Sequence, residues 1–422
     1  MELNKKNKNK YILILVLFGS FLGFFAGIII SFTLKIMSLG IHFVWHYIPK
    51  VSGVDGLAYY LIVCALGGLI IGLYQKKFGV YPETMEEVMK VMKDKGYYPY
   101  DKLHIILVAA LLPLIFGGSL GPEAGLTGVI VGLCCLIGHR LEYKGEELRE
   151  LAMSGVAATL SLVFQAPFFG IANNIEEEAN FSEIPQDERV FTQKERKKIK
   201  SSIYVFAVIA GLIGFKFVGL FIEGGTGIPR FDYGADPTFE DWKWFFPICL
   251  AGVLAGLVYQ IGTVLFSKIS KVFGNKNILR CIVGGLGIGI IGFWVPFSMF
   301  SGEHELGEII SSWSTFSAVA LIGIGVCKLL LTGFCLNFGW IGGNIFPIIF
   351  SGTSIGFAMV SLLGINPIFG VAVVTAAVTG YIMKKPIAVV GILILCFPIK
   401  LVIPMVLSAY ISSLIPDINK NS

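Results

Sequence analysis

Long apolar runs constrain this chain more than any other feature of its sequence. They cover residues 11–34, 57–74, 103–138, 203–222, 245–266, 281–300, 315–336, 345–383 and 386–414. A helix needs about 20 apolar residues to cross a membrane, so several of these runs are too long for one span. Gly or Pro interrupts them internally, and the chain has 51 glycines. We therefore predict an all-α membrane protein with closely packed, interrupted helices.

The composition and the charge pattern support a multi-pass membrane protein. Hydrophobic residues make up 55% of the chain and charged residues only 14%, whereas soluble domains carry about 25% charged residues. Basic residues cluster at 76–77, 93–102, 139–149, 189–200, 268–280 and 384–385. The positive-inside rule places most of these clusters on the cytoplasmic face. The net charge of +5 therefore reflects membrane topology and does not indicate a nucleic-acid partner.

The N-terminus is predicted to stay in the cytoplasm. Residues 1–10 are polar and rich in lysine, and the apolar run that follows is long and has no small-residue cleavage site. A signal peptide would have a shorter apolar core that ends at such a site. We predict a retained first helix and a location in the plasma membrane.

The sequence predicts no metal, no cofactor and no enzymatic activity. Its eight cysteines lie mostly within apolar segments and show no metal-ligand spacing with histidine, which favours a packing role. No phosphate-binding G-x-x-x-x-G-K-[ST] loop is present in the sequence, which argues against ATP-driven pumping.

A polar stretch at residues 176–202 divides the chain into two halves of similar length. The predicted organisation is a cytoplasmic tail (1–10), a first membrane half (11–180), a cytoplasmic linker (181–202), a second membrane half (203–414) and a tail (415–422). Each half contains a glycine-rich break, at 117–125 and at 339–347. Matching breaks in two halves indicate an inverted-repeat transporter with its site near the membrane midplane.

Glu123 is the only acidic residue between Leu103 and Gly138, and no Lys or Arg accompanies it. A charged side chain at membrane depth is expensive, so we interpret Glu123 as functional. It follows Pro122 within the first glycine-rich break. Proline suits the first position of a helix, and glycines let the backbone approach a ligand closely. Because helix N-termini bind anions, this break predicts an anion site.

Residues 118–125, Gly-Ser-Leu-Gly-Pro-Glu-Ala-Gly, resemble the G-[KR]-E-G-P motif of the CLC family of chloride channels and proton-coupled anion antiporters. Residues 343–347 resemble that family's G-x-F-x-P motif, with Ile345 where phenylalanine is usual. Residues 164–171 resemble its F-N-A-P-x-x-G-I segment, and Glu177 follows at the matching distance. The resemblance extends over nearly the whole chain and indicates a divergent prokaryotic member without a cytoplasmic domain.

The resemblance implies a fold and a set of site residues. The fold is a CLC-like inverted repeat of two halves with interrupted and re-entrant helices, assembled as a homodimer with an anion path in each subunit. Glu123 would gate that path, and Glu177 would pass protons to the cytoplasm. The anion would be held by residues at helix ends, namely Gly79, Gly121, Pro122, Glu123, Ala124, Gly343, Asn344 and Ile345.

Two departures from the family pattern concern hydroxyl groups. The family's G-S-G-I-P motif aligns with residues 78–82, so Gly79 replaces the serine. We also expect the chain to end before the last family helix, which normally supplies an anion-binding tyrosine. Both departures bear on chloride selectivity more than on anion binding by helix ends.

The predicted function is transport of chloride or a similar small inorganic anion across the lipid bilayer, as a proton-coupled antiporter gated by Glu123. Ionised Glu123 would occupy the anion site, and protonation would release it. Without proton delivery through Glu177, the same architecture would be a pH-gated channel. A fluoride or other anion channel or exporter is an alternative, since that branch of the family also lacks the serine. Alternatives from other classes are a cation-coupled solute transporter and a membrane assembly protein that transports nothing.

Two histidine-containing segments are not explained by the predicted site. Residues 302–305, Gly-Glu-His-Glu, have the residue types of a metal site, but no fourth ligand lies nearby in the sequence, so a surface role is favoured. His42 and His46 are four residues apart near the end of the first span, which places them on one helical face. Interfacial packing is the simpler interpretation of that pair.

Overall fold

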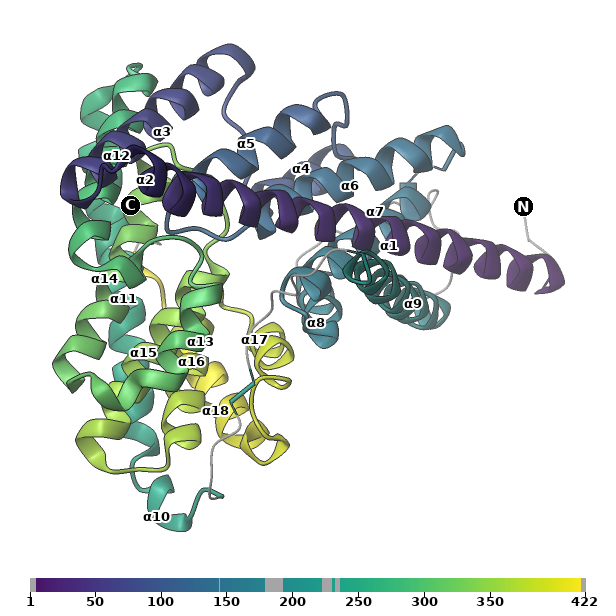
Figure 1. The fold of residues 1–422 in the computed structure, drawn as a ribbon. Coiled ribbons are helices and arrows are strands. Elements are labelled where there is room, and N and C mark those ends of the chain that lie inside the picture. The colour runs from purple at the N-terminus through teal and green to yellow at the C-terminus, as the bar shows by residue number, and fades with distance from the viewer. Residues whose placement is uncertain (1–4, 144, 179–192, 222–229, 232–235, 419–422) are drawn as a thin grey trace. The chain divides into compact units, whose positions relative to one another are not determined.

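The computed structural model describes residues 5–143, 145–178, 193–221, 230–231 and 236–418. Within these ranges the protein is helical and has no β-strand (Figure 1). The α-helices are α1 (Lys5–His42), α2 (Ile48–Ser52), α3 (Gly56–Phe78), α4 (Met85–Lys95), α5 (Leu103–Ile115), α6 (Glu123–Arg140), α7 (Gly145–Val163), α8 (Pro167–Glu178), α9 (Gln193–Gly219), α10 (Phe239–Trp242), α11 (Phe245–Ser270), α12 (Asn277–Trp294), α13 (Glu303–Ser312), α14 (Ala318–Asn337), α15 (Ile345–Leu363), α16 (Pro367–Met383), α17 (Pro386–Leu393) and α18 (Val402–Ser413). Short π or 3-10 segments are η1 (Phe43–Tyr47), η3 (Lys271–Phe273), η4 (Pro296–Ser298), η5 (Trp313–Thr315) and η6 (Ile399–Leu401).

Eight helical segments of the described chain are long and apolar enough to cross a membrane. They are Leu13–Ser52, Gly56–Phe78, Glu123–Arg140, Ser201–Gly219, Phe245–Phe273, Asn277–Trp294, Ala318–Asn337 and Ile345–Leu363. Three shorter apolar helical segments accompany them. The protein is therefore a multi-pass membrane protein, and the predicted all-α class is confirmed.

The longest predicted apolar runs are broken, as expected from their length. Residues 103–138 divide into α5 and α6, residues 345–383 into α15 and α16, and residues 386–414 into α17 and α18. The break after α15 shows the local cause. Gly364 ends α15 in a left-handed conformation (φ +65°), and the side chain of Asn366 accepts hydrogen bonds from the next two amides at 3.1 Å. A glycine C-cap, an Asn N-cap and Pro367 at the first helical position together stop one helix and start the next.

The chain forms two compact units. Unit 1 comprises Met1–Ile36, Pro82–Leu107 and Glu123–Gly225, and unit 2 comprises Met37–Tyr81, Val108–Pro122 and Thr226–Ser422. These units do not coincide with the two sequence halves, because two segments of the first half belong to unit 2. The division into membrane halves stays a prediction. The C-terminal part of the predicted polar linker is helical, since α9 begins at Gln193.

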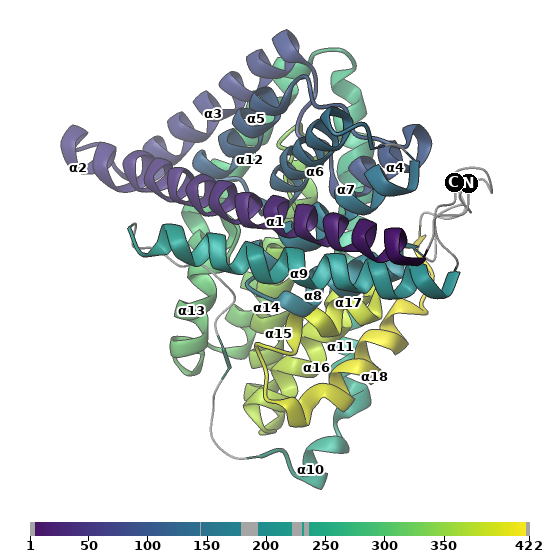
Figure 2. The same ribbon diagram turned by 90° about the vertical axis from the view of Figure 1, so that its right-hand side faces the viewer.

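Glycines allow very close helix packing within unit 2. Helices α3 and α12 lie side by side in both views (Figures 1 and 2). A Cβ atom added at Gly285 would lie 2.0 Å from the carbonyl oxygen of Cys64, and one added at Gly68 would lie 2.2 Å from that of Cys281. Only glycine fits at these two crossing points. In a second group, α15 packs against both α14 and α16. Helices α15 and α16 are almost completely buried.

Unit 1 is built around α7, which packs against α6, α8 and α9. Residues 151–163 of α7 are all buried. The first turns of α7 also contain a buried acidic side chain. Glu150 is 3% exposed, and its carboxylate accepts a hydrogen bond from the Tyr204 hydroxyl at 2.9 Å. The carboxylate of Glu150 is thus hydrogen-bonded inside the helix bundle.

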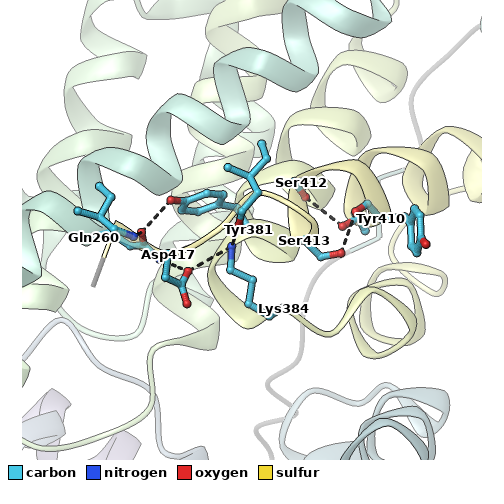
Figure 3. Close-up of polar contacts among 10 residues, drawn as sticks. Gln260, Tyr381, Lys384, Tyr410, Ser412, Ser413 and Asp417 are labelled. Carbon is cyan, nitrogen blue, oxygen red and sulfur yellow. Dashed lines mark hydrogen bonds and ion pairs between the residues drawn. The ribbon is translucent and has the colours of Figure 1, made fainter. Parts of the chain in front are cut away.

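A polar cluster holds the residues that follow α18 in unit 2 (Figure 3). Lys384 Nζ lies 3.2 Å from the Asp417 carboxylate and donates a hydrogen bond to Ile415 O at 2.6 Å. The Gln260 side-chain amide also donates to Asp417, and the Tyr381 hydroxyl donates to Gln260 Oε1 at 2.7 Å. The cluster ties the segment after α18 to α11 and to the end of α16.

Candidate functional site

The two glycine-rich breaks meet within unit 2, although they are far apart in the sequence. The amide of Gly121 donates to Gly343 O at 2.7 Å, and the amide of Gly343 donates to Gly121 O at 2.8 Å. This reciprocal pair forms an isolated antiparallel bridge between buried residues. The bridge fixes the backbone immediately before α6 to the backbone immediately before α15.

The first break is fully buried from Gly117 to Pro122. Gly117 adopts a left-handed backbone (φ +93°), and the amide of Gly118 donates to Pro113 O at 2.8 Å, which closes the end of α5. The Ser119 hydroxyl lies 3.0 Å from the Thr332 hydroxyl of α14. Buried polar groups need such partners, so this hydroxyl pair fixes the course of the break.

The second break follows α14. Gly339 has a φ of +85°, and its carbonyl oxygen accepts a hydrogen bond from Gln75 Nε2 of α3 at 2.7 Å. Trp340 is completely buried, and its indole N–H donates to Cys281 O of α12 at 2.9 Å. The break is therefore held by α3 and α12, the pair that packs through glycines.

Asn344 is the N-cap residue of α15, and its side chain makes no capping bond. Its Nδ2 group instead donates to the hydroxyl of Tyr259, a buried residue of α11, at 3.3 Å. The first N–H groups of an α-helix have no acceptor within the helix itself, and the helix dipole makes that end positive. The start of α15 thus combines a positive helix end with a nearby hydroxyl.

Glu123 is the first residue of α6 in unit 1 and is 1% exposed. The Thr127 hydroxyl donates to Glu123 O at 2.7 Å and so closes the first turn of the helix. Ala124 is also 1% exposed. Chain connectivity puts Glu123 two residues after Gly121, the residue that pairs with Gly343.

The remaining predicted site residues have different surroundings. Gly79 lies at the exposed end of α3 with a φ of +101°, and its amide donates to Gln75 O at 2.9 Å. That amide already has an acceptor. Glu177 belongs to the last turn of α8, but its side chain lies outside the described residues.

Sequence reasoning missed two side chains near the breaks, Tyr259 and Lys328. Lys328 of α14 is completely buried, and its ammonium group donates to the carbonyl oxygens of Phe297 (3.2 Å), Met299 (2.6 Å) and Phe300 (3.0 Å). The argument applied to Glu123 would have identified Lys328, since it is a lone charge inside an apolar run. No comparable sequence signal marks Tyr259, because tyrosine is common in membrane helices.

Comparison with known proteins gives three kinds of similarity. Residues 67–417 match the family model described as voltage gated chloride channel. The chain is 24% identical over 347 residues to YfeO of Shigella flexneri, described as a candidate ion-transport protein, with 79% of this chain and 76% of that protein covered. YfeO of Escherichia coli O139:H28 matches at the same identity and coverage.

The structure resembles a slow cyanobacterial Cl−/H+ antiporter, with a TM-score of 0.79, 15% identity and 94% of each chain covered. It also resembles a CLC-type fluoride/proton antiporter, with a TM-score of 0.75, 18% identity, 98% of this chain covered and 97% of that one. At these identities the likeness concerns the fold, and it confirms the predicted CLC-like fold class.

Proposed function

We propose that this chain, which belongs to the voltage gated chloride channel family, carries a small inorganic anion across the plasma membrane in exchange for protons. The proposed anion is chloride. The observation that best supports this function is the buried bridge between Gly121 and Gly343, because it fixes the starts of two helices, α6 and α15. Helix starts favour anions and disfavour cations. The same argument disfavours a cation-coupled solute transporter.

In the proposed site, the anion is held at the beginning of α15 by backbone N–H groups around Asn344 and Ile345. Gly121 and Gly343 shape the site rather than bind the anion, since the amide of each donates to the carbonyl oxygen of the other. The Tyr259 hydroxyl is 3.3 Å from the Asn344 side chain and supplies a hydroxyl beside this helix end. We assign to it the role of a hydroxyl donor to the anion, since Gly79 stands where the resembled family motif has a serine.

Glu123 acts as the gate in this proposal. Its ionised carboxylate occupies the anion position, because both carry the same charge and both are attracted by helix starts. Protonation removes the charge, lets the side chain leave and admits the anion. Glu177 delivers the proton from the cytoplasmic side, which couples anion and proton movement in opposite directions.

The proposed arrangement in the membrane is a homodimer with cytoplasmic N-termini and one anion path in each subunit. Each chain has a mass of 45.9 kDa. Light scattering of the purified protein in detergent is expected to give twice the chain mass after subtraction of the bound detergent. A mass equal to one chain would contradict the dimer.

The function is tested by efflux of chloride, fluoride and nitrate from proteoliposomes that contain the purified protein. We expect chloride efflux, and we expect Tyr259→Phe to raise the KM for chloride by about 10-fold or more, because hydrogen bonds to charged groups contribute about 1.5–3 kcal/mol. Tyr410→Phe is the matched control, since Tyr410 is an exposed residue of α18. Faster efflux of fluoride than of chloride would assign the protein to fluoride export, and no efflux of any of the three anions would overturn anion transport.

A further inference from the structure

A cavity of about 360 Å³ in unit 2 brings together the two histidine segments that the proposed function does not use. His42 of α1 and His46 of η1 line it on one side, and His304 and Glu305 of α13 line it on another. The imidazole rings of His42 and His46 lie 5.3 Å apart, centroid to centroid. Imidazoles from two distant segments of the sequence therefore line the same cavity.

Two residues that line the cavity are hydrogen-bonded to the end of α5 and to the first glycine-rich break. Trp45 and Phe300 both line the cavity, and their rings meet edge to face at 5.5 Å. The Trp45 indole N–H donates to Ile115 O at 2.9 Å, and the Phe300 amide donates to Gly117 O at 3.4 Å. These two hydrogen bonds attach the cavity to the end of α5 and to the backbone that continues to Gly121.

The cavity lies away from the lysine-rich ends of the helices that form it. Tyr60, near the start of α3, lines the cavity, whereas Lys76 and Lys77 are in the last turn of that helix. Phe300 follows the C-terminal end of α12, whose N-terminal end follows Lys276. With the proposed topology, the cavity faces the outside of the cell.

Protonation of the histidines reverses the charge of this region. Besides the histidines, Glu305 is the one ionisable carboxylate in the described lining of the cavity, and it interacts electrostatically with the buried Lys328 ammonium. Glu303 of the same helix is buried and is not among the lining residues. Tyr60 is neutral at physiological pH. The lining carboxylate contributes −1, and three protonated imidazoles bring the sum over the lining residues to +2. Imidazole is the side chain that changes charge between about pH 5 and pH 8.

We propose that this cavity is an outer capture site for small inorganic anions, which binds them when its three histidines are protonated. A metal does not suit it, because the described residues contain no group of three or more ligands placed to hold an ion. Protonated imidazoles attract the anion, and the bound anion in turn stabilises the protonated imidazoles, so anion and protons load together. The capture site rests on the proposed anion transport and supplies that path with anions at its outer end.

The test uses right-side-out vesicles of an expression host and the initial rate of chloride uptake at external pH values of about 7.5 and about 5.5. The KM comparisons use the Glu123→Ala background, so that the gating carboxylate does not itself titrate, and the wild type is measured alongside to establish chloride flux. In this background we expect the KM for external chloride to fall on the order of 5-fold on acidification, as expected for a few partly exposed charge interactions. Adding His42→Gln, His46→Gln and His304→Gln should remove this dependence.

His104→Gln is the matched control, because His104 is an exposed histidine of α5 outside the cavity. Line broadening of the chloride NMR signal by the purified protein provides a second measurement that does not depend on transport. The wild type should show an additional chloride site at the lower pH, and the triple glutamine variant should lack it. Retention of the pH-dependent KM or of the additional chloride site in the triple variant would overturn the capture site. Absence of chloride flux in the wild type at both pH values would instead overturn the proposed function.

Discussion

At the scale of single residues, the informative side chains are charged groups placed where a membrane protein usually has none. Lys328 is completely buried in a membrane-spanning helix, and all three of its hydrogen bonds go to the backbone of residues 297–300. Phe297 lies in η4, and Met299 and Phe300 follow it. The chain does not continue as an α-helix there, so no helical N–H binds these carbonyl groups. The ammonium group therefore satisfies the carbonyl groups of a buried turn, and Phe300 of this turn lines the histidine-containing cavity.

Replacement of Lys328 by methionine is expected to lower the free energy of unfolding by about 3 kcal/mol. The change keeps much of the side-chain volume but leaves three carbonyl oxygens without their donor, and a buried unsatisfied group typically destabilises by about 1–3 kcal/mol. Equilibrium unfolding in detergent micelles measures the effect. Lys276→Met is the control, since Lys276 is exposed at the start of α12 and its loss should change stability by less than about 0.5 kcal/mol. Equal stability of the two variants would contradict the role given to Lys328.

The site residues differ in how visible they are in the sequence. Glu123 and the two glycine-rich breaks can be predicted, because a lone charge and clustered glycines are unusual in apolar runs. Tyr259 could not be predicted, since its position beside Asn344 depends on how α11 packs against α15. The anion-binding role of Gly79 and the proton-transfer role of Glu177 stay predictions, and the amide of Gly79 already donates to Gln75 O, which weakens the case for Gly79.

At the scale of helices, length and apolar composition predict most elements, because a lipid-facing helix must be apolar over its full span. Helix α7 is the instructive exception, since no predicted apolar run covers it. Its first turns contain charged residues at positions 146, 147, 149 and 150, which shorten the apolar segment. The helix is nevertheless buried within unit 1. Protein neighbours surround it, so it does not need the continuous apolar surface that lipid requires.

Close packing of α3 against α12 gives a prediction at the same scale. We expect Gly285→Ala to lower the free energy of unfolding by about 2 kcal/mol, because the added Cβ would collide with the backbone of Cys64 and force the two helices apart. Gly323→Ala is the matched control in the spanning helix α14, where a Cβ would meet nothing within 4 Å. It should be neutral or stabilising by up to about 1 kcal/mol. Thermal unfolding of both variants in one detergent compares them directly, and a stable Gly285→Ala protein would contradict the proposed close contact.

At the scale of the whole molecule, the two predicted sequence halves and the two compact units divide the chain at different places. The matching breaks suggest two repeats, whereas contacts divide the chain so that residues 37–81 and 108–122 join unit 2. Sequence patterns detect repeats because local glycine and charge patterns recur, but they do not reveal which segments pack together. The bridge between Gly121 and Gly343 is one result of that packing. It joins the first-half break to the second-half break within one unit.

The most direct test of the account records chloride and proton movement together in proteoliposomes with an imposed chloride gradient. The compared proteins are the wild type, Glu123→Ala and Glu308→Ala, the last being a control at an exposed glutamate of α13. We predict that chloride efflux drives proton uptake in the wild type and in the control, and that Glu123→Ala keeps chloride flux but moves no protons. Chloride flux without proton movement in the wild type, or proton coupling that persists in Glu123→Ala, would contradict antiport gated by this carboxylate.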